Sequence, residues 1–155
     1  MLGANVIATA STEAKLKKAR QLGADHTVNY AKKDFYAEVK RITGKKGVEV
    51  VIEHIGGRTF EESMLCLARD GRLITCGATA GGAVTVDLRY VFTRQLTISG
   101  SNMGSKGELL TLLGHFEAGR LKPVVDRVLP LAEAAQAHRL IMDRAGFGKL
   151  VLSVG

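Results

Sequence analysis

The sequence predicts an α/β protein in which a parallel sheet is covered by helices on both faces. Short apolar runs alternate with segments whose apolar residues recur at helical spacing, and the connections between them are short. Residues 48–52 (VEVVI) are mostly apolar, as is typical of a strand buried on both faces. Alternating strands and helices of this kind pair in parallel, because each helix carries the chain back across the sheet.

The composition limits the class of protein. The chain has 155 residues, of which 46% are apolar and 24% charged, so it can bury the core of one domain. It contains no run of about 18 apolar residues, which argues against a membrane span. Cys66 and Cys76 are too few for a disulfide framework or a tetrahedral zinc site. We therefore expect a cytoplasmic protein that has no signal peptide and no membrane partner.

The net charge of +7 is concentrated early in the chain. Residues 1–50 hold ten Lys and Arg against five Asp and Glu, mainly in the stretches 15–20 and 40–46. Such an excess can mark a nucleic-acid surface, but no aromatic stacking residues accompany it, so solvated helix faces explain it better. A small ligand that carries phosphate fits the same charge. We expect no nucleic-acid partner.

The apolar patterns and the turn residues divide the chain into twelve elements. The predicted strands are residues 5–9, 26–30, 48–52, 72–76, 96–99, 124–129 and 149–154. The predicted helices follow Ser11, Asp34, Thr59 and Ser105, and a last one covers residues 132–142.

The helix starts are marked by capping residues. Ser11 or Thr12 can cap the first helix, and Asp34 can cap the second. The pairs Thr59–Glu62 and Ser105–Glu108 have the spacing of capping boxes, in which each residue bonds the backbone of the other.

Ligands of open α/β sheets bind at the carboxyl ends of the strands. Small and polar residues follow the strands of this chain at 10–12, 53–57, 77–79 and 100–102. They suit backbone contacts with an extended ligand, but they form no catalytic constellation. The chain also has no Gly-x-Gly-x-x-Gly, His-Glu-x-x-His or Cys-x-x-Cys motif, so we predict neither catalytic nor metal-binding residues.

Several segments together resemble a known family. Residues 3–30 (GANVIATASTEAKLKKARQLGADHTVNY) resemble the second strand, helix and third strand of the coenzyme domain in medium-chain dehydrogenases. Residues 48–57 (VEVVIEHIGG) and 71–81 (GRLITCGATAG) resemble its fourth and fifth strands, and residues 147–155 (FGKLVLSVG) its closing strand. The resemblance is specific to the superfamily of zinc-type alcohol dehydrogenases and quinone oxidoreductases.

The resemblance implies an incomplete doubly wound, Rossmann-like parallel sheet that lacks its first strand and glycine-rich turn. Residues 1–120 would form the partial coenzyme-binding domain. Residues 121–155 would form a strand-helix-strand tail that in the family packs on the catalytic domain. The chain would then be a C-terminal portion that begins at an internal methionine.

The missing strand is central in the family's strand order, 3-2-1-4-5-6. The missing strand leaves three possibilities. The strands at residues 5–9 and 48–52 pair directly, or another segment or chain fills the gap between them, or the chain folds poorly alone. We expect exposed apolar surface and a tendency to associate.

The resemblance implies a set of cofactor contacts around the adenosine ribose. NAD-specific enzymes place an acid at the end of the second Rossmann strand, where this chain has Ala10. Ser11 and Thr12 can donate hydrogen bonds and Lys15 supplies a charge, while Tyr30 resembles a tyrosine that flanks a 2′-phosphate. NADP(H) is therefore favoured over NAD(H). The alternative is that Ser11 is only a helix cap and Lys15 only a surface lysine.

Further contacts are implied along the rest of the dinucleotide. They are His54, Ile55 and Gly56 at the nicotinamide-side ribose; Gly77, Ala78 and Thr79 along the nicotinamide; Ser99, Gly100 and Ser101 at the carboxamide; and Lys149 at the pyrophosphate. A solvent-facing lysine is an equally good explanation of Lys149.

The function implied by the resemblance is that of the coenzyme-binding portion of an NAD(P)(H)-dependent oxidoreductase. Its full-length parent would transfer hydride to or from a small alcohol or carbonyl compound, and any zinc would lie in the N-terminal domain that this chain lacks. The alternatives are a portion of a zinc-independent quinone or enone reductase, and a catalytically inert nucleotide-binding or assembly module. The chain alone is expected to be inactive, and to form homo-oligomers through residues 96–99.

Overall fold

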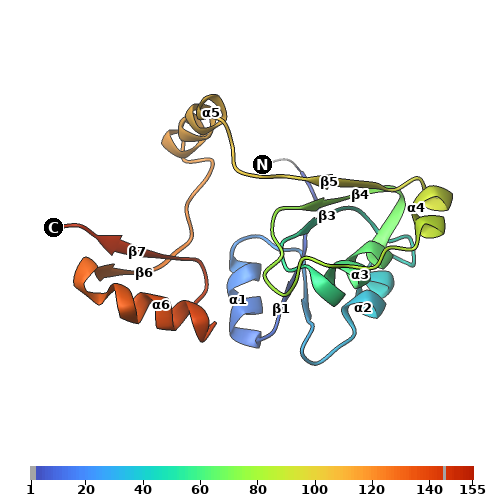
Figure 1. Ribbon diagram of the computed structural model, residues 1–155, viewed down its shortest axis with the longest axis horizontal. Helices are drawn as coiled ribbons and strands as arrows, with labels where there is room; N and C mark the ends of the chain where they lie inside the picture. The colour runs from blue at the N-terminus through green and yellow to red at the C-terminus, as the bar shows by residue number, and fades with distance from the viewer. Residues whose placement is uncertain (1–2, 145) are drawn as a thin grey trace. The chain divides into compact units, whose positions relative to one another are not determined.

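The computed structural model describes residues 3–144 and 146–155, and these fall into two compact units (Figure 1). Residues 4–103 form one unit and residues 104–155 form most of the other. Among the described residues, none of the helices combines the length and the apolarity that crossing a bilayer requires.

Strands and helices alternate through residues 4–103, as the sequence predicts. The strands are β1 (Ile7–Ala10), β2 (His26–Asn29), β3 (Val48–Glu53), β4 (Leu67–Thr75) and β5 (Thr97–Gly100). The helices are α1 (Glu13–Gln21), α2 (Phe35–Ile42), α3 (Gly57–Cys66) and α4 (Leu88–Arg94). Every strand pair in this unit is parallel, so the predicted α/β class is confirmed.

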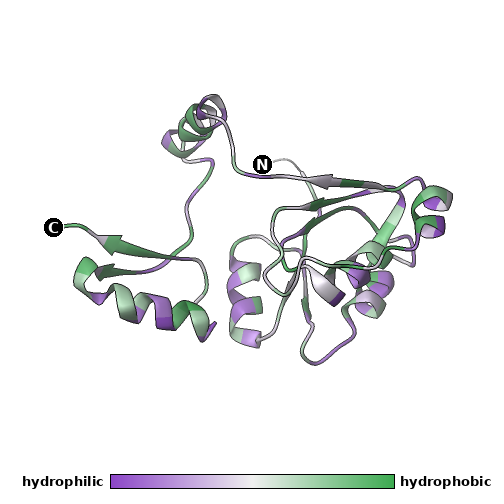
Figure 2. Ribbon diagram, in the orientation of Figure 1, coloured by the Kyte–Doolittle hydropathy of each residue, from purple (hydrophilic) through white to green (hydrophobic). Residues whose placement is uncertain are grey.

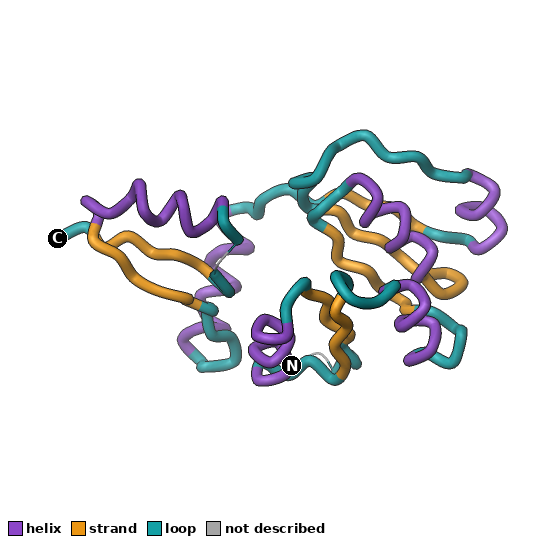
Figure 3. The backbone as a smooth tube through the Cα atoms, turned by 90° about the horizontal axis from the view of Figure 1, so that it is seen from below, coloured by secondary structure: helices purple, strands orange, loops and turns teal. Residues whose placement is uncertain are grey.

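The strands of this unit form two sheets, which Figure 3 shows as separate groups. One sheet is β1-β2 and the other is β3-β4-β5. Among the described residues, β1 and β3 do not pair with each other, and no strand pairs with the free edge of either. Direct pairing of these two strands, one of the three predicted outcomes, is therefore wrong, and each strand has an open edge.

The prediction that β3 is buried on both faces is also wrong. The side chains of Val50 and Ile52 are 49% and 66% exposed. β3 has a strand neighbour only on the β4 side, and α3 packs against both of these strands. An apolar strand stays exposed where no neighbouring element of the described residues covers it.

The core of the unit lies between α3, β4 and the approach to β5. Leu67 and Leu73 are completely buried, and Phe60, Met64 and Leu96 surround them. The sequence reading missed α4, although Asp87 caps it by accepting the N–H of Arg89 at 2.9 Å. Its side chains Tyr90 and Val91 pack against this core.

Three of the predicted helix caps are confirmed and one is wrong. Thr12 and Asp34 accept backbone N–H groups of the first turns of α1 and α2. Ser105 and Glu108 form the predicted capping box. The Thr59–Glu62 box is absent, because α3 begins earlier, at Gly57, and Glu62 instead pairs with Arg58.

Residues 104–155 contain a helix followed by a strand-helix-strand arrangement. Its elements are α5 (Lys106–Glu117), β6 (Val125–Pro130), the 3₁₀ helix η1 (Leu131–Glu133), α6 (Ala134–Met142) and β7 (Lys149–Ser153). β6 and β7 pair in parallel. Figure 2 shows apolar residues on both strands and along α5. Many of them are exposed, namely Leu109, Leu110, Leu112, Leu113, Phe116, Val128 and Val151, so the expected exposed apolar surface is present.

Candidate functional site

Two loops are joined at the carboxyl ends of β3 and β4. The loop after β3 covers residues 54–56 and leads into α3 at Gly57, and the loop after β4 runs from residue 76 to residue 87. Ala80 donates its N–H to the carbonyl oxygen of Ile55 at 2.7 Å, and Gly57 donates to Gly81 at 3.0 Å. The loops therefore extend the pairing of the two strands beyond the sheet and form one continuous, hydrogen-bonded rim.

A buried carboxylate fixes the first of these loops. Glu53, the last residue of β3, is only 3% exposed. Its Oε1 accepts the N–H of Ile55 at 2.7 Å, and both of its oxygens accept the N–H of Gly56, at 3.0 and 3.1 Å. Sequence reasoning did not include Glu53 among the site residues. A charged residue that ends an apolar strand just before a loop and two glycines was the available signal.

The two loops approach so closely that glycine is required. Gly56 has φ +76°, and a Cβ there would lie 2.2 Å from the carbonyl oxygen of Gly81. A Cβ on Gly77 would lie 2.9 Å from the carbonyl oxygen of His54. Glycine at positions 56 and 77 therefore allows the two loops to pack backbone against backbone along this rim.

The ends of β1 and β2 bring a second group of predicted residues together. Tyr30 donates its N–H to the carbonyl oxygen of Ala10 at 3.2 Å, so it lies directly beside the segment that leads into α1. The hydroxyl oxygen of Thr12 accepts the N–H of Lys15 at 3.3 Å. The side chain of Tyr30 is 42% exposed and Ser11 is half-buried. Hydroxyl groups and a lysine at the start of a helix are a donor set that suits a phosphate group.

The end of β5 adjoins the loop after β4. Gly100 pairs with Thr75, and Ser101 donates its N–H to the carbonyl oxygen of Thr75 at 2.9 Å. Ser99, Gly100 and Ser101 are all exposed. Three of the predicted groups, at 54–56, 77–79 and 99–101, therefore lie next to one another at one end of the β3-β4-β5 sheet.

Lys149 is the predicted residue that belongs to the other unit. It is the first residue of β7, its side chain is exposed, and its N–H donates to the carbonyl oxygen of Val124 at 2.8 Å. Its predicted contact with a pyrophosphate stays a prediction.

Zinc does not fit the part of the chain that the structure describes. In residues 3–144 and 146–155, no group of three or more His, Cys, Asp or Glu side chains could hold a metal ion. Burial raises the pKa of the Cys66 thiol to about 12, which disfavours the thiolate that zinc requires. The rim of loops instead suits an extended organic ligand that is held by backbone groups and hydroxyls.

Comparison with known proteins places these features in context. The family model for zinc-binding dehydrogenases matches residues 1–118. A crystal structure of an NAD-dependent alcohol dehydrogenase is 50% identical and superposes with a TM-score of 0.91, over 99% of this chain and 45% of that one.

Two curated relatives match over nearly the whole chain. The 2-haloacrylate reductase of a Burkholderia species is 38% identical, over 97% of this chain and 48% of its own. A zinc-type alcohol dehydrogenase-like protein of Schizosaccharomyces pombe is 34% identical, over 98% and 45%. The chain therefore spans about half the length of the relatives it matches.

Proposed function

The chain belongs to the zinc-binding dehydrogenase family, and we propose that it is the coenzyme-binding part of an NADP(H)-dependent oxidoreductase. A dehydrogenase family implies a dinucleotide coenzyme and a small-molecule substrate. We propose an alcohol or carbonyl compound as the substrate of the whole protein. The likeness to a 2-haloacrylate reductase supports a second candidate, the reduction of an activated alkene, quinone or enone.

The observation that carries the preference for NADP(H) is the environment of Ala10. This residue ends β1, where an acid would bond the ribose 2′-hydroxyl of NAD. Tyr30 lies beside it, and Ser11, Thr12 and Lys15 follow within one turn of α1. These residues would hold the 2′-phosphate, because hydroxyls donate to phosphate oxygens and an ammonium group offsets their charge.

The rim formed by the loops after β3 and β4 would hold the nicotinamide half. His54, Ile55 and Gly56 would line its ribose, and the backbone of residues 77–79 would lie along the ring. Ser99, Gly100 and Ser101, which end β5 beside Thr75, would bond the carboxamide. The bound coenzyme supplies or accepts the hydride, and the residues of this chain bind and orient it. We propose no catalytic residue within the chain.

The open strand edges fit a part of a larger protein. We propose that another segment of the longer protein lies between β1 and β3, where it would cover the exposed Val50 and Ile52. We also propose that residues 121–155 pack on the catalytic part and that Lys149 reaches the pyrophosphate. Two free cysteines, one of them exposed, agree with the reducing cytoplasm that we propose as the location.

A homodimer is proposed through β5. This strand pairs only with β4 in the described part of the chain, and all four of its residues are exposed. An unpaired strand edge offers a row of backbone N–H and C=O groups to a second copy.

Calorimetric titration of the chain with NADPH and with NADH tests the proposed coenzyme. We expect NADPH to bind at least about tenfold more tightly, because only its 2′-phosphate meets Ser11, Thr12 and Lys15. Lys15→Gln should reduce this ratio. Lys17→Gln, which removes an exposed charge from the same helix, should leave it unchanged.

Two results would count against the proposed function. Equal affinities for NADPH and NADH would exclude the assigned phosphate contacts. No binding of either dinucleotide would show that the chain has no coenzyme site of its own.

A further inference from the structure

We infer that a cleft at the amino end of β2 binds a phosphoryl group, at a site separate from the proposed coenzyme site. The cleft has a volume of about 380 Å³ and is lined by Arg20, Asp25, His26, Thr27, Arg41 and Ile42. All of these residues lie within the unit formed by residues 4–103. They belong to α1, β2, α2 and the connection that precedes β2.

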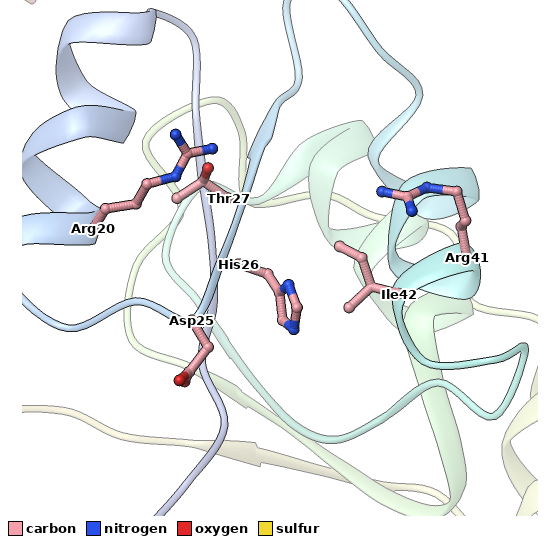
Figure 4. Close-up of a pocket in the computed structure, with 6 residues that line it drawn as sticks. All are labelled: Arg20, Asp25, His26, Thr27, Arg41 and Ile42. Carbon is pink, nitrogen blue, oxygen red and sulfur yellow. The ribbon is translucent and has the colours of Figure 1, made fainter.

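The cleft is lined by one arginine from each of the two basic stretches that stand out in the sequence. Arg20 comes from the stretch 15–20 and lies in the last turn of α1. Arg41 comes from the stretch 40–46 and lies in the last turn of α2. Figure 4 shows the two guanidinium groups extending inward from opposite sides of β2, with His26 between them. Residues that are about twenty positions apart in the sequence thus converge on one space.

Stabilisation of helix ends explains only part of this arrangement. A cation near a helix C-terminus offsets the helix dipole, and Lys18 and Lys40 already serve α1 and α2 in this way. The charge of Arg41 is matched by Glu38, whose Oε2 accepts from Nε and Nη2 at 3.2 and 2.9 Å. Arg20 makes no ion pair with a carboxylate of the described residues. Its guanidinium group therefore remains available to an anion.

The charge and the size of the cleft indicate the ligand class. One carboxylate lines the cleft, that of Asp25, and its Oδ2 accepts the N–H of Val6 at 2.7 Å. Because Arg41 is paired with Glu38, Arg20 is the arginine of the cleft that is left to attract an anion, and its planar guanidinium fork matches the oxygens of a phosphoryl group. The volume exceeds that of inorganic phosphate and suits a small phosphate ester. The free ion and the ester share this chemistry.

The cleft lies at the end of the strand opposite to the coenzyme residues. His26 is the first residue of β2, whereas Tyr30 follows its last residue. A phosphoryl group bound beside His26 would leave Ser11, Thr12 and Lys15 unperturbed. The two sites can therefore be separated by experiment, and the cleft does not depend on the proposed function.

The test is a titration of the ¹⁵N-labelled chain, followed by NMR at constant ionic strength. Inorganic phosphate and glycerol 3-phosphate are the two probes, with chloride as the reference anion. We expect saturable shifts at the amides of His26 and Thr27 and at the Nε–H of Arg20. Tighter binding of glycerol 3-phosphate would identify an ester site, and equal binding would identify a site for the free ion.

Matched variants separate a built site from general charge attraction. Arg20→Gln should weaken binding by at least about tenfold, and it breaks no ion pair among the described residues. Lys17→Gln removes the same charge from the same helix and should change the affinity less than twofold. Equal losses in the two variants would overturn the inference. So would the absence of saturable shifts, or shifts confined to Ser11 and Thr12.

Discussion

The carboxylate of Glu53 accepts the backbone N–H of Gly56 with both of its oxygens, at 3.0 and 3.1 Å. The acceptor ends β3, and the donor begins the close approach to the loop after β4. This one relationship connects the buried end of a strand to the rim where the proposed coenzyme would lie.

Glu53→Gln should destabilise the chain and loosen this loop. The amide puts an NH2 group in place of one of the two oxygens that share the N–H of Gly56, so two donors face each other in a buried site, at a cost of about 1–3 kcal/mol in the free energy of unfolding. Chemical denaturation measures that cost. Glu49→Gln, an exposed change on the same strand, is the control and should stay within about 0.5 kcal/mol of the wild type. A cost no greater than that of the control would show that the Glu53 bonds do not hold the loop.

Gly56→Ala should separate the two loops. The added Cβ would meet the carbonyl oxygen of Gly81 at 2.2 Å, and an alanine at φ +76° is strained, so we expect a loss of roughly 1–3 kcal/mol or more. The proposed coenzyme affinity should fall as well, because the rim changes shape. Gly82→Ala is the matched control, since its Cβ would meet nothing within 4 Å. Thermal denaturation and calorimetry read out the two effects. Equal behaviour of both variants would refute the close approach.

The two cysteines should differ in reactivity. Cys76 is exposed, whereas Cys66 is buried and its pKa is raised to about 12 by that burial. At pH 8 only about one Cys66 thiol in ten thousand would be ionised. A thiol reagent should therefore label one site rapidly. Cys76→Ser should abolish this rapid phase and Cys66→Ser should preserve it. Rapid labelling of two thiols in the native chain would contradict the buried position of Cys66.

Acid should weaken the fold through its paired carboxylates. The hydrogen bond from Arg41 holds the pKa of Glu38 below its ordinary value of 4.5, and the N–H of Ser105 lowers the pKa of Glu108 in the same way. A pKa that is lower in the folded state stabilises the fold above pH 4.5 and loses this effect as the pH falls through the folded-state value. The difference in melting temperature between the wild type and Glu38→Gln should therefore shrink below pH 4.5. A difference that stays constant down to acid pH would exclude the ion pair with Arg41.

Self-association should depend on the free edge of β5. Ile98 is 41% exposed on this strand, and Ile98→Lys places a charge where a second copy would pair. We expect the dimer dissociation constant to rise at least about tenfold, as measured by analytical ultracentrifugation. Leu22→Lys makes a comparable change at an exposed residue after α1 and should have no effect. A wild-type chain that is monomeric and monodisperse in light scattering would rule out the proposed dimer.

Local signals in the sequence predicted most of the elements. The alternation of strands and helices, the caps at Thr12 and Asp34, and the Ser105–Glu108 box all depend on residues a few positions apart. Helix α4 was missed because a glycine-rich loop precedes it and its packing against Leu67 and Leu73 is not a local property. The sequence also did not predict that Arg20 and Arg41 line one cleft, because this depends on how α1 and α2 are placed around β2.

The sequence by itself determined the family and the order of the elements other than α4 and η1, and it placed the last residue of each strand to within one position. These depend on periodicity, on capping chemistry and on motifs read in sequence. Only the tertiary structure decided that β1 and β3 remain unpaired, that Val50 and Ile52 are exposed, and that Glu53 holds Gly56. The physical reason is that strand pairing and burial depend on which neighbours are present. An apolar run shows that a strand can be buried, but only the neighbouring elements can cover it.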